Sequence, residues 1–351
     1  MRKILFLLIF CVLLLPHGAS AKDLKVGFVY VSPVGDEGYS YAQDLGRQEI
    51  EKMPGVSTSY VEDVPEGSDA GRVIQNMARK GYDIIFATSF GYMDPLQKVA
   101  KKFPDTVFMH CSGYKRAENV GTYFGRMYQA RYLTGMLAGY KTESNTLGYV
   151  AAYPIPEVIR GINAFTLGAQ AVNPDVEVRV VWTKTWYDPA TEKEAAKSLL
   201  DAGADVIAMH QDSPAPQEAA QEAGAYSIGY NSDMSKIAPK AHLTSAMWNW
   251  APIFKEIVED VRAGEWESRD IWYGLEHGVV DIAPMHEDVT EKEKSRILAV
   301  KERISSGEEH VFSGPIRDQS GEVRIPDGKT APDKELLGMD WFVQGVVGTT
   351  E

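Results

Sequence analysis

The stretch Leu24–Gly46, which reads LKVGFVYVSPVGDEGYSYAQDLG, decides the fold of this chain. Residues 26–31 are almost all apolar, which is typical of a short strand buried on both faces of a sheet. A proline and two glycines mark residues 32–38 as a loop, and a helix is expected directly after it. This order places the loop at the carboxyl end of a parallel strand, where open α/β sheets bind ligands.

The loop and the start of the helix carry side chains suited to recognition. Asp36 lies in the loop, and Tyr39 and Ser40 are expected to open the helix. An acid, an aromatic ring and a hydroxyl suit a small, flat, polar ligand. An ordinary surface loop is the alternative, and this stretch alone fits both interpretations equally well.

The amino terminus has the composition of a secretory signal peptide. Arg2 and Lys3 precede an unbroken apolar run over residues 4–15, and Ala19-Ser20-Ala21 supplies a small-x-small cleavage site. The run is too short to span a membrane, and no later stretch has spanning length. We therefore expect the mature chain outside the cytoplasm and not as an integral membrane protein.

The cysteines and the charge refine this expectation. Cys11 lies inside the apolar run, which does not fit a lipid-attachment site, so a periplasmic protein is expected rather than a lipid-anchored one. Cys111 is then alone and cannot form an internal disulfide. Without Arg2 and Lys3, 34 basic residues face 49 acidic ones, a net charge of 34 − 49 = −15. This charge argues against nucleic acid as a partner.

Strands and helices alternate along residues 24–231, which favours an α/β fold. The segment Gly81–Ala87 (GYDIIFA) is echoed by Gly203–Ala208 (GADVIA), and the surrounding order of elements repeats as well. We interpret this as two doubly wound parallel-sheet lobes around a ligand cleft. The expected division is a signal peptide over 1–21, an N-terminal lobe from 22–124 plus 246–266, a C-terminal lobe from 125–245 plus 267–290, and a C-terminal extension over 291–351.

After residue 241 the pattern becomes less regular. Strands are expected at 242–247, 271–273 and 279–282, with helices at 253–263 and 290–304. A hairpin over 311–325 and a tail over 341–347 follow, and we expect the tail to pack back on a lobe. The sequence does not indicate what the extension does.

Catalytic and cofactor motifs are absent from the sequence. There is no Gly-x-Gly-x-x-Gly fingerprint, no P-loop, no Gly-x-Ser-x-Gly elbow and no zinc-spaced Cys/His cluster. His110 and Cys111 are adjacent on an expected strand and point to opposite faces, so they make a poor nucleophile–base pair. We expect a protein that is not an enzyme and that uses no cofactor or metal.

Recognition residues instead gather where strands end. Aromatic rings there can stack on planar ligands, and carboxylates and amides can bond a heterocycle's edge. One such residue alone is more often packing or capping, whereas several at the same end of successive strands favour a site. The candidate ligand-binding residues are Asp36, Tyr39, Ser40, Ser89, Phe90, Tyr92, Trp186, Asp212, Ser213, Asn231, Asp233, Trp248 and Asn249.

From about Lys25 to Met285 the chain resembles the basic membrane protein family, the purine-nucleoside receptors of bacterial ABC transporters. The landmarks of this resemblance are Gly35–Ser40 (GDEGYS), Tyr123–Gly125 with Tyr132–Gly135, Asn163–Phe165 with Gly168-Ala169, Ile228–Asp233 (IGYNSD) and Thr244–Trp248 (TSAMW). The resemblance implies a type I periplasmic-binding-protein fold. It also implies an ABC permease as partner, with a separate ATPase subunit.

The resemblance assigns roles to some residues. It implies that Asp36 reads the edge of a purine base and that Tyr39 stacks on its ring. In the family, an acid matching Asn231 or Asp233 and a lysine close after the Thr-Ser pair hold ribose hydroxyls. Here Trp248 stands where that lysine is expected. We therefore expect a free base such as adenine, with Trp248 filling the sugar's place.

Other functions fit the same fold. A purine nucleoside receptor for adenosine, inosine or guanosine is the first alternative. A periplasmic enzyme that cleaves nucleosides would use carboxylates such as Asp36, Glu157 and Asp212, although nothing in the sequence makes them converge. A sugar receptor is a further alternative, since aromatic rings also stack on sugars.

Overall fold

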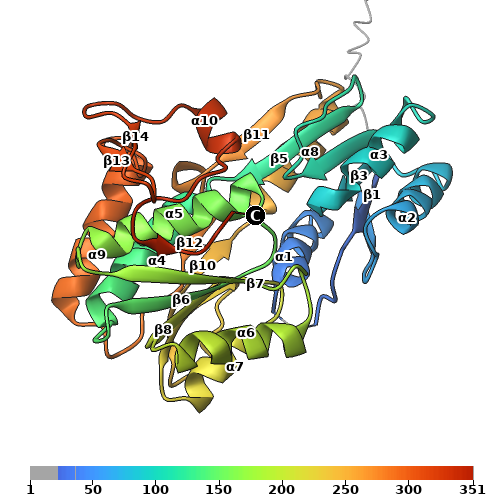
Figure 1. Ribbon diagram of the computed structural model, residues 1–351. Helices are drawn as coiled ribbons and strands as arrows, with labels where there is room; N and C mark the ends of the chain where they lie inside the picture. Colours follow the sequence, from blue (N-terminus) through green and yellow to red (C-terminus); the bar gives the residue numbers. More distant parts are fainter. Residues whose placement is uncertain (1–22, 36, 351) are drawn as a thin grey trace, which may run out of the picture.

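The computed structural model describes residues 23–35 and 37–350. The predicted signal peptide and Asp36 lie outside the described residues. Two parallel-stranded layers with flanking helices form two lobes, and the chain passes between them more than once (Figure 1). The expected α/β fold of two doubly wound lobes is confirmed.

The N-terminal lobe is built on a parallel sheet with the strand order β11-β5-β4-β3-β1-β2. Its central strands are apolar because both faces are covered, as β3 shows with every residue buried. Helices α1–α3 and α8 flank this sheet (Figure 1). The elements are β1 (Leu24–Val29), α1 (Tyr39–Glu51), β2 (Val56–Val61), α2 (Ser68–Arg79), β3 (Ile84–Ala87), the 3-10 helix η1 (Phe90–Tyr92), α3 (Met93–Ala100), β4 (Val107–Cys111), β5 (Val120–Gly125), α8 (Ala251–Ala263) and β11 (Asp270–Tyr273).

The C-terminal lobe carries the order β12-β10-β9-β8-β6-β7-β15, in which β12 runs antiparallel to β10. Its helices begin at recognisable signals, such as Pro156 in the first turn of α5 and the Asp188 side chain that caps α6. The elements are α4 (Met127–Lys141), β6 (Thr146–Ala151), α5 (Pro156–Gln170), β7 (Glu177–Trp182), α6 (Pro189–Asp201), β8 (Val206–His210), α7 (Ala215–Glu222), β9 (Tyr226–Asn231), β10 (His242–Trp248), η2 (Leu275–His277) and β12 (Val280–Ile282).

The remainder of the chain packs on the C-terminal lobe. It contains α9 (Glu291–Ser305), β13 (Ile316–Arg317), β14 (Val323–Ile325), α10 (Asp333–Leu337) and β15 (Val346–Val347). The ribbon of α9, β13, β14 and α10 lies beside α4 and α5, on the opposite side of the molecule from α1–α3 (Figure 1). The expected tail packs back by adding β15 as a parallel edge strand to β7.

The crossings between the lobes differ from the expected boundaries. Residues 246–248 belong to β10 and pair in the C-terminal sheet, although they were expected in the N-terminal lobe. Conversely, β11 pairs with β5 in the N-terminal sheet, although 267–290 was expected in the C-terminal lobe. A local apolar pattern identifies a strand but not the sheet it joins, because pairing depends on distant residues.

Throughout the described ranges, no helix combines the length and apolar character needed to cross a bilayer.

Candidate ligand-binding cleft

A cavity lies between the lobes, where strands of both sheets end. Its volume is about 20 Å³, enough for about one water molecule. This space is too small for a ligand much larger than water, so we expect the lobes to separate for binding. The lining residues are Val31, Tyr39, Thr88, Ser89, Phe90, Ser112, Glu157, Trp186, His210, Asp212 and Tyr230.

The loop after β1 forms the contact that closes the cavity. The backbone of Gly38 lies against the backbone carbonyl of Asp212, so close that a Cβ atom on Gly38 would be 1.8 Å from that oxygen. The Ser232 hydroxyl also donates a hydrogen bond to the carbonyl of Glu37. This loop thus belongs to one lobe and docks on the other.

Aromatic rings line both sides of the cavity. The Tyr39 hydroxyl donates to the Thr88 carbonyl at 2.8 Å, which fixes the ring at the first turn of α1. From the other lobe, Trp186 lies 6.3 Å from the His210 ring, and His210 lies 4.5 Å from the Tyr230 ring. These rings present apolar faces on which a planar ligand can stack.

Two carboxyl groups of the C-terminal lobe reach the same cavity. Asp212 is buried, and Glu157 lies in the first turn of α5. Burial raises the pKa of Glu157 to about 7, and the positive charge of Arg160 opposes this rise. Burial, with Arg131 and Arg160 nearby, also lowers the pKa of His210 well below its usual value, so that imidazole is neutral. The cavity therefore offers acceptors to a ligand that carries N–H groups.

A larger cavity of about 320 Å³ adjoins this one and shares Phe90, Ser112 and Glu157 with it. We call it the outer chamber. Both lobes line it, and Leu337 of α10 forms part of its wall. Its other lining residues are Gly113, Tyr114, Arg116, Thr122, Phe124, Ile155, Pro156, Arg160, Asp270 and Trp272.

The structure brings together Tyr39, Ser89, Phe90, Trp186 and Asp212 from the predicted set. The Ser89 hydroxyl donates to the Glu66 carboxylate at 2.6 Å, so this hydroxyl already has a partner in its own lobe. Asp36 lies outside the described residues, and its predicted role stays a prediction.

Several predicted residues hold the loops instead of lining the described cavity. Ser40 is fully buried and bonds the Ser32 hydroxyl at 2.7 Å. Tyr92 is fully buried and donates to the Val64 carbonyl. Ser213 donates to the buried carboxyl of Glu192. Their polar groups are used within their own lobes.

The predicted Asn231 and Asp233 also have local partners. Asn231 is fully buried, with φ +75°, and donates to the Gln211 carbonyl at 3.0 Å. Asp233 is exposed and accepts a bond from the Ser235 amide at 2.9 Å. Neither lines the described cavity.

Trp248 and Asn249 lie at the crossing after β10. The Trp248 ring stacks on Trp250 at 4.4 Å and 22°, packs near Phe124 and touches Gly125. Asn249 is exposed and donates to the Gly278 carbonyl at 3.0 Å. Trp248 therefore packs the crossing and does not line the described cavity, and its expected place beside a ligand stays a prediction.

Sequence reasoning missed Val31, Thr88, Ser112, His210 and Tyr230, and it named Glu157 only as a suspect carboxylate. His210 ends β8 and Tyr230 is the penultimate residue of β9. Counting the last residues of each strand together with the loops would have found both.

Among residues 23–35 and 37–350, no cluster of His, Cys, Asp and Glu could hold a metal ion.

Two parallel-sheet lobes with a polar and aromatic cavity at their strand ends define a binding protein of the type I periplasmic class. The chain belongs to the Bmp family, described as PnrA-like ABC transporter substrate-binding proteins, whose model matches residues 23–311. This confirms the resemblance seen in the sequence.

Relatives and solved structures agree with this class. The chain is 44% identical to a purine-binding protein of Brucella abortus, over 93% of both chains. It is 43% identical to a putative ABC transporter glucose-binding protein of Haloferax volcanii, over 83% of this chain and 74% of that one. A solute-binding protein structure from Aeropyrum pernix matches with a TM-score of 0.72 at 20% identity, covering 90% and 98% of the two chains. The last comparison supports the fold alone.

Proposed function

We propose that this chain is an exported receptor that binds a free purine base such as adenine and delivers it to an ABC permease. The observation that carries the proposal is the closed inter-lobe cavity, where aromatic rings of both lobes face Glu157 and Asp212. The Brucella abortus relative, named a purine-binding protein, supports the same ligand class. The predicted signal peptide supports a periplasmic location.

Recognition would combine stacking with directional bonds. Tyr39 and Phe90 of one lobe and Trp186 of the other offer rings for a planar base. The carboxylates of Glu157 and Asp212 accept hydrogen bonds from the amine and N–H groups of such a base. Docking of the Gly38 loop would then exclude water from the bound ligand.

The proposed preference for a base over a nucleoside is supported by the size of the ligand and not by Trp248. Trp248 does not line the described inner cavity, and what supports a base is that it needs less added space between the lobes than a nucleoside does. A nucleoside's sugar would have to occupy the outer chamber, which a base would leave free.

The first experiment is to purify the chain expressed from Lys22 without added ligand, denature it and identify the released molecules by mass. Calorimetry with adenine, adenosine and inosine then ranks the ligands. A stoichiometric base, or tighter binding of adenine than of adenosine, supports the proposal. Adenosine or inosine bound ten times more tightly than adenine would overturn the base preference and keep the purine class.

A sugar is the second candidate ligand, because the 43% identical relative is named a glucose-binding protein. Glucose would stack its apolar face on the same rings and donate its hydroxyls to Glu157 and Asp212. Calorimetry with glucose under the same conditions decides between them, and glucose binding without purine binding would contradict the proposal.

We propose that the chain binds without chemical turnover, with transport energy supplied by a separate ATPase subunit. Glu157 and Asp212 do reach one cavity, so the enzyme alternative can be tested directly. Adenosine incubated with the protein should remain intact by chromatography. Release of adenine and ribose, lost in Asp212→Asn, would instead establish a hydrolase.

A further inference from the structure

The last part of the chain extends beyond the residues that the family model matches. We call residues 312–350 the C-terminal segment, since the match ends at residue 311. This segment lies along α5 (Figure 1) and adds β15 to the edge of the C-terminal sheet. Its contacts reach from that edge to the ligand cleft.

The C-terminal segment holds one face of α5 along most of the helix. Buried Arg160 donates from Nη1 to the Leu336 carbonyl, and buried Asn163 donates to the Trp341 carbonyl at 2.7 Å. The Asn163 oxygen also accepts the Val343 amide at 2.9 Å. The segment thus satisfies buried polar groups of α5 that would otherwise lack partners.

The same helix carries Glu157 into the ligand cavity. Glu157 and Arg160 are three residues apart, so they are neighbours on one face of α5. Glu157 lines both the inner cavity and the outer chamber, and Arg160 lines the outer chamber. The hydrogen bond from Arg160 to Leu336 therefore fixes the end of α5 that faces the ligand cavity.

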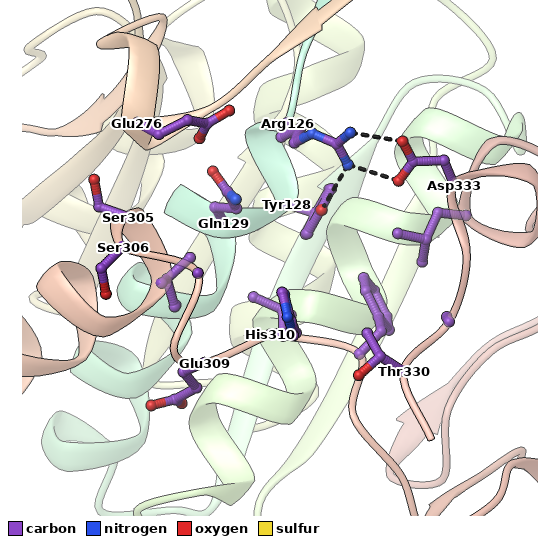
Figure 2. Close-up of a pocket in the computed structure, with 16 residues that line it drawn as sticks. Arg126, Tyr128, Gln129, Glu276, Ser305, Ser306, Glu309, His310, Thr330 and Asp333 are labelled. Carbon is purple, nitrogen blue, oxygen red and sulfur yellow. Dashed lines mark hydrogen bonds and ion pairs between the residues drawn. The ribbon is translucent and has the colours of Figure 1, made fainter. Parts of the chain in front are cut away.

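The C-terminal segment also acts on the opposite lobe through two arginines. Arg126 pairs with Asp333 of α10 through two bonds of 2.6 and 2.8 Å, and it contacts the Tyr128 hydroxyl at 3.2 Å (Figure 2). Its guanidinium lies 4.1 Å from the ring of Trp272, and that of Arg160 lies 5.1 Å from the same ring. Trp272 belongs to β11 of the N-terminal lobe, so Arg160 of α5 packs across the lobes. Arg126 lies at the crossing directly after β5, where its backbone amide donates to the Tyr273 carbonyl at 2.7 Å.

We propose that the C-terminal segment is a positioning element of the ligand site. Through Leu336 and Asp333 it fixes Arg160 and Arg126 against Trp272, and it thereby sets the place and the charge of Glu157 when the lobes close. The inference rests on the proposed function, because it needs a ligand with N–H groups for which the Glu157 carboxylate is the acceptor.

The protonation of Glu157 can be followed through the pH dependence of ligand binding. A purely structural role of the C-terminal segment would leave that pH dependence unchanged. Burial raises the pKa of Glu157, and Arg160 and the Ser112 hydroxyl lower it, whereas Glu66 across the cleft raises it. Binding to the carboxylate should strengthen as pH rises through about 7. The other titratable or charged groups around it are Tyr39, Cys111, His210, Asp212, Tyr230, Arg116 and Asp270.

The first test measures adenine affinity from pH 5.5 to 9 in the full mature chain. Arg160→Gln removes the cation, so the midpoint of the pH dependence should rise by about one unit or more. Arg160→Lys keeps the charge and should keep the midpoint near the wild-type value. Glu157→Gln should abolish the dependence near neutrality. An unchanged midpoint in Arg160→Gln would overturn the proposal.

The second test uses a matched pair of exposed acids in the C-terminal segment. Asp333→Asn breaks the pair with Arg126, whereas Asp340→Asn makes the same charge change at an exposed residue. We expect Asp333→Asn to weaken adenine binding about twofold to fivefold and to speed its release. Asp340→Asn should match the wild type, and equal behaviour of the two variants would contradict the inference.

A failure of the proposed function can be distinguished from a failure of the positioning role. If the wild type binds no purine at any pH, the proposed function fails. If it binds adenine while the Arg160 and Asp333 variants behave like their controls, only the positioning role fails. Should Arg160→Gln not fold, the comparison of Asp333→Asn with Asp340→Asn still decides, because both residues are exposed.

Discussion

Tyr39 is a residue that the sequence predicted for the ligand site and that lines the inner cavity. Its ring is held by a bond to the Thr88 carbonyl, so removing it takes away a pre-positioned stacking surface. We expect Tyr39→Ala to weaken purine binding by about 1–3 kcal/mol. Calorimetry checks this, with Tyr41→Ala, two residues further along α1, as the control. Equal losses in both variants would show that the effect is not stacking.

The Glu192 carboxyl is expected to make the free energy of unfolding depend on pH. It is fully buried, and burial raises its pKa to about 7, above the unfolded value of 4.5. The folded state then holds a proton that the unfolded state releases, so this group's contribution to stability falls as pH rises from 4.5 to 7. Glu192→Gln should therefore gain stability relative to the wild type between pH 5 and 8, on the order of 1–3 kcal/mol.

Urea unfolding of both proteins at pH 5 and 8 measures this difference. The control is Glu194→Gln, an exposed residue on the same helix, which should show no such gain. A constant difference between Glu192→Gln and the wild type at both pH values would refute the assignment.

Among the elements, the loop between β1 and α1 reaches the other lobe at Gly38. An alanine there would place its Cβ on the Asp212 carbonyl, so the closed contact could not form without movement. We expect Gly38→Ala to weaken ligand binding about tenfold or more and to leave urea unfolding without ligand nearly unchanged. Gly35→Ala is the matched control, since nothing lies within 4 Å of its added Cβ.

The elements also show what the sequence could predict. The apolar runs of β3 and β8 and the alternating helices are local signals, and they identified both sheets correctly. The lobe of β11 was not predictable, because pairing with β5 joins residues nearly 150 positions apart. The packing of Trp248 on Trp250 was not predictable for a similar reason, because it depends on how the chain crosses between the lobes.

Across the whole molecule, the small closed cavity predicts a change of shape. A purine does not fit a space of about 20 Å³, so we expect the lobes to separate before binding and to close afterwards. Small-angle scattering should show a smaller radius of gyration after adenine is added to ligand-free protein. Gly38→Ala should show less contraction, and an equal radius with and without ligand would contradict a closing motion.

The stacked pair of Trp248 and Trp250 has a spectroscopic consequence. The two indoles lie 4.4 Å apart at the segment where the chain passes from β10 to α8, between the lobes. Transition dipoles so close together couple, and the coupling depends steeply on their mutual angle. Opening and closing of the lobes should therefore appear as a change in the exciton band of the circular dichroism spectrum, without any added label.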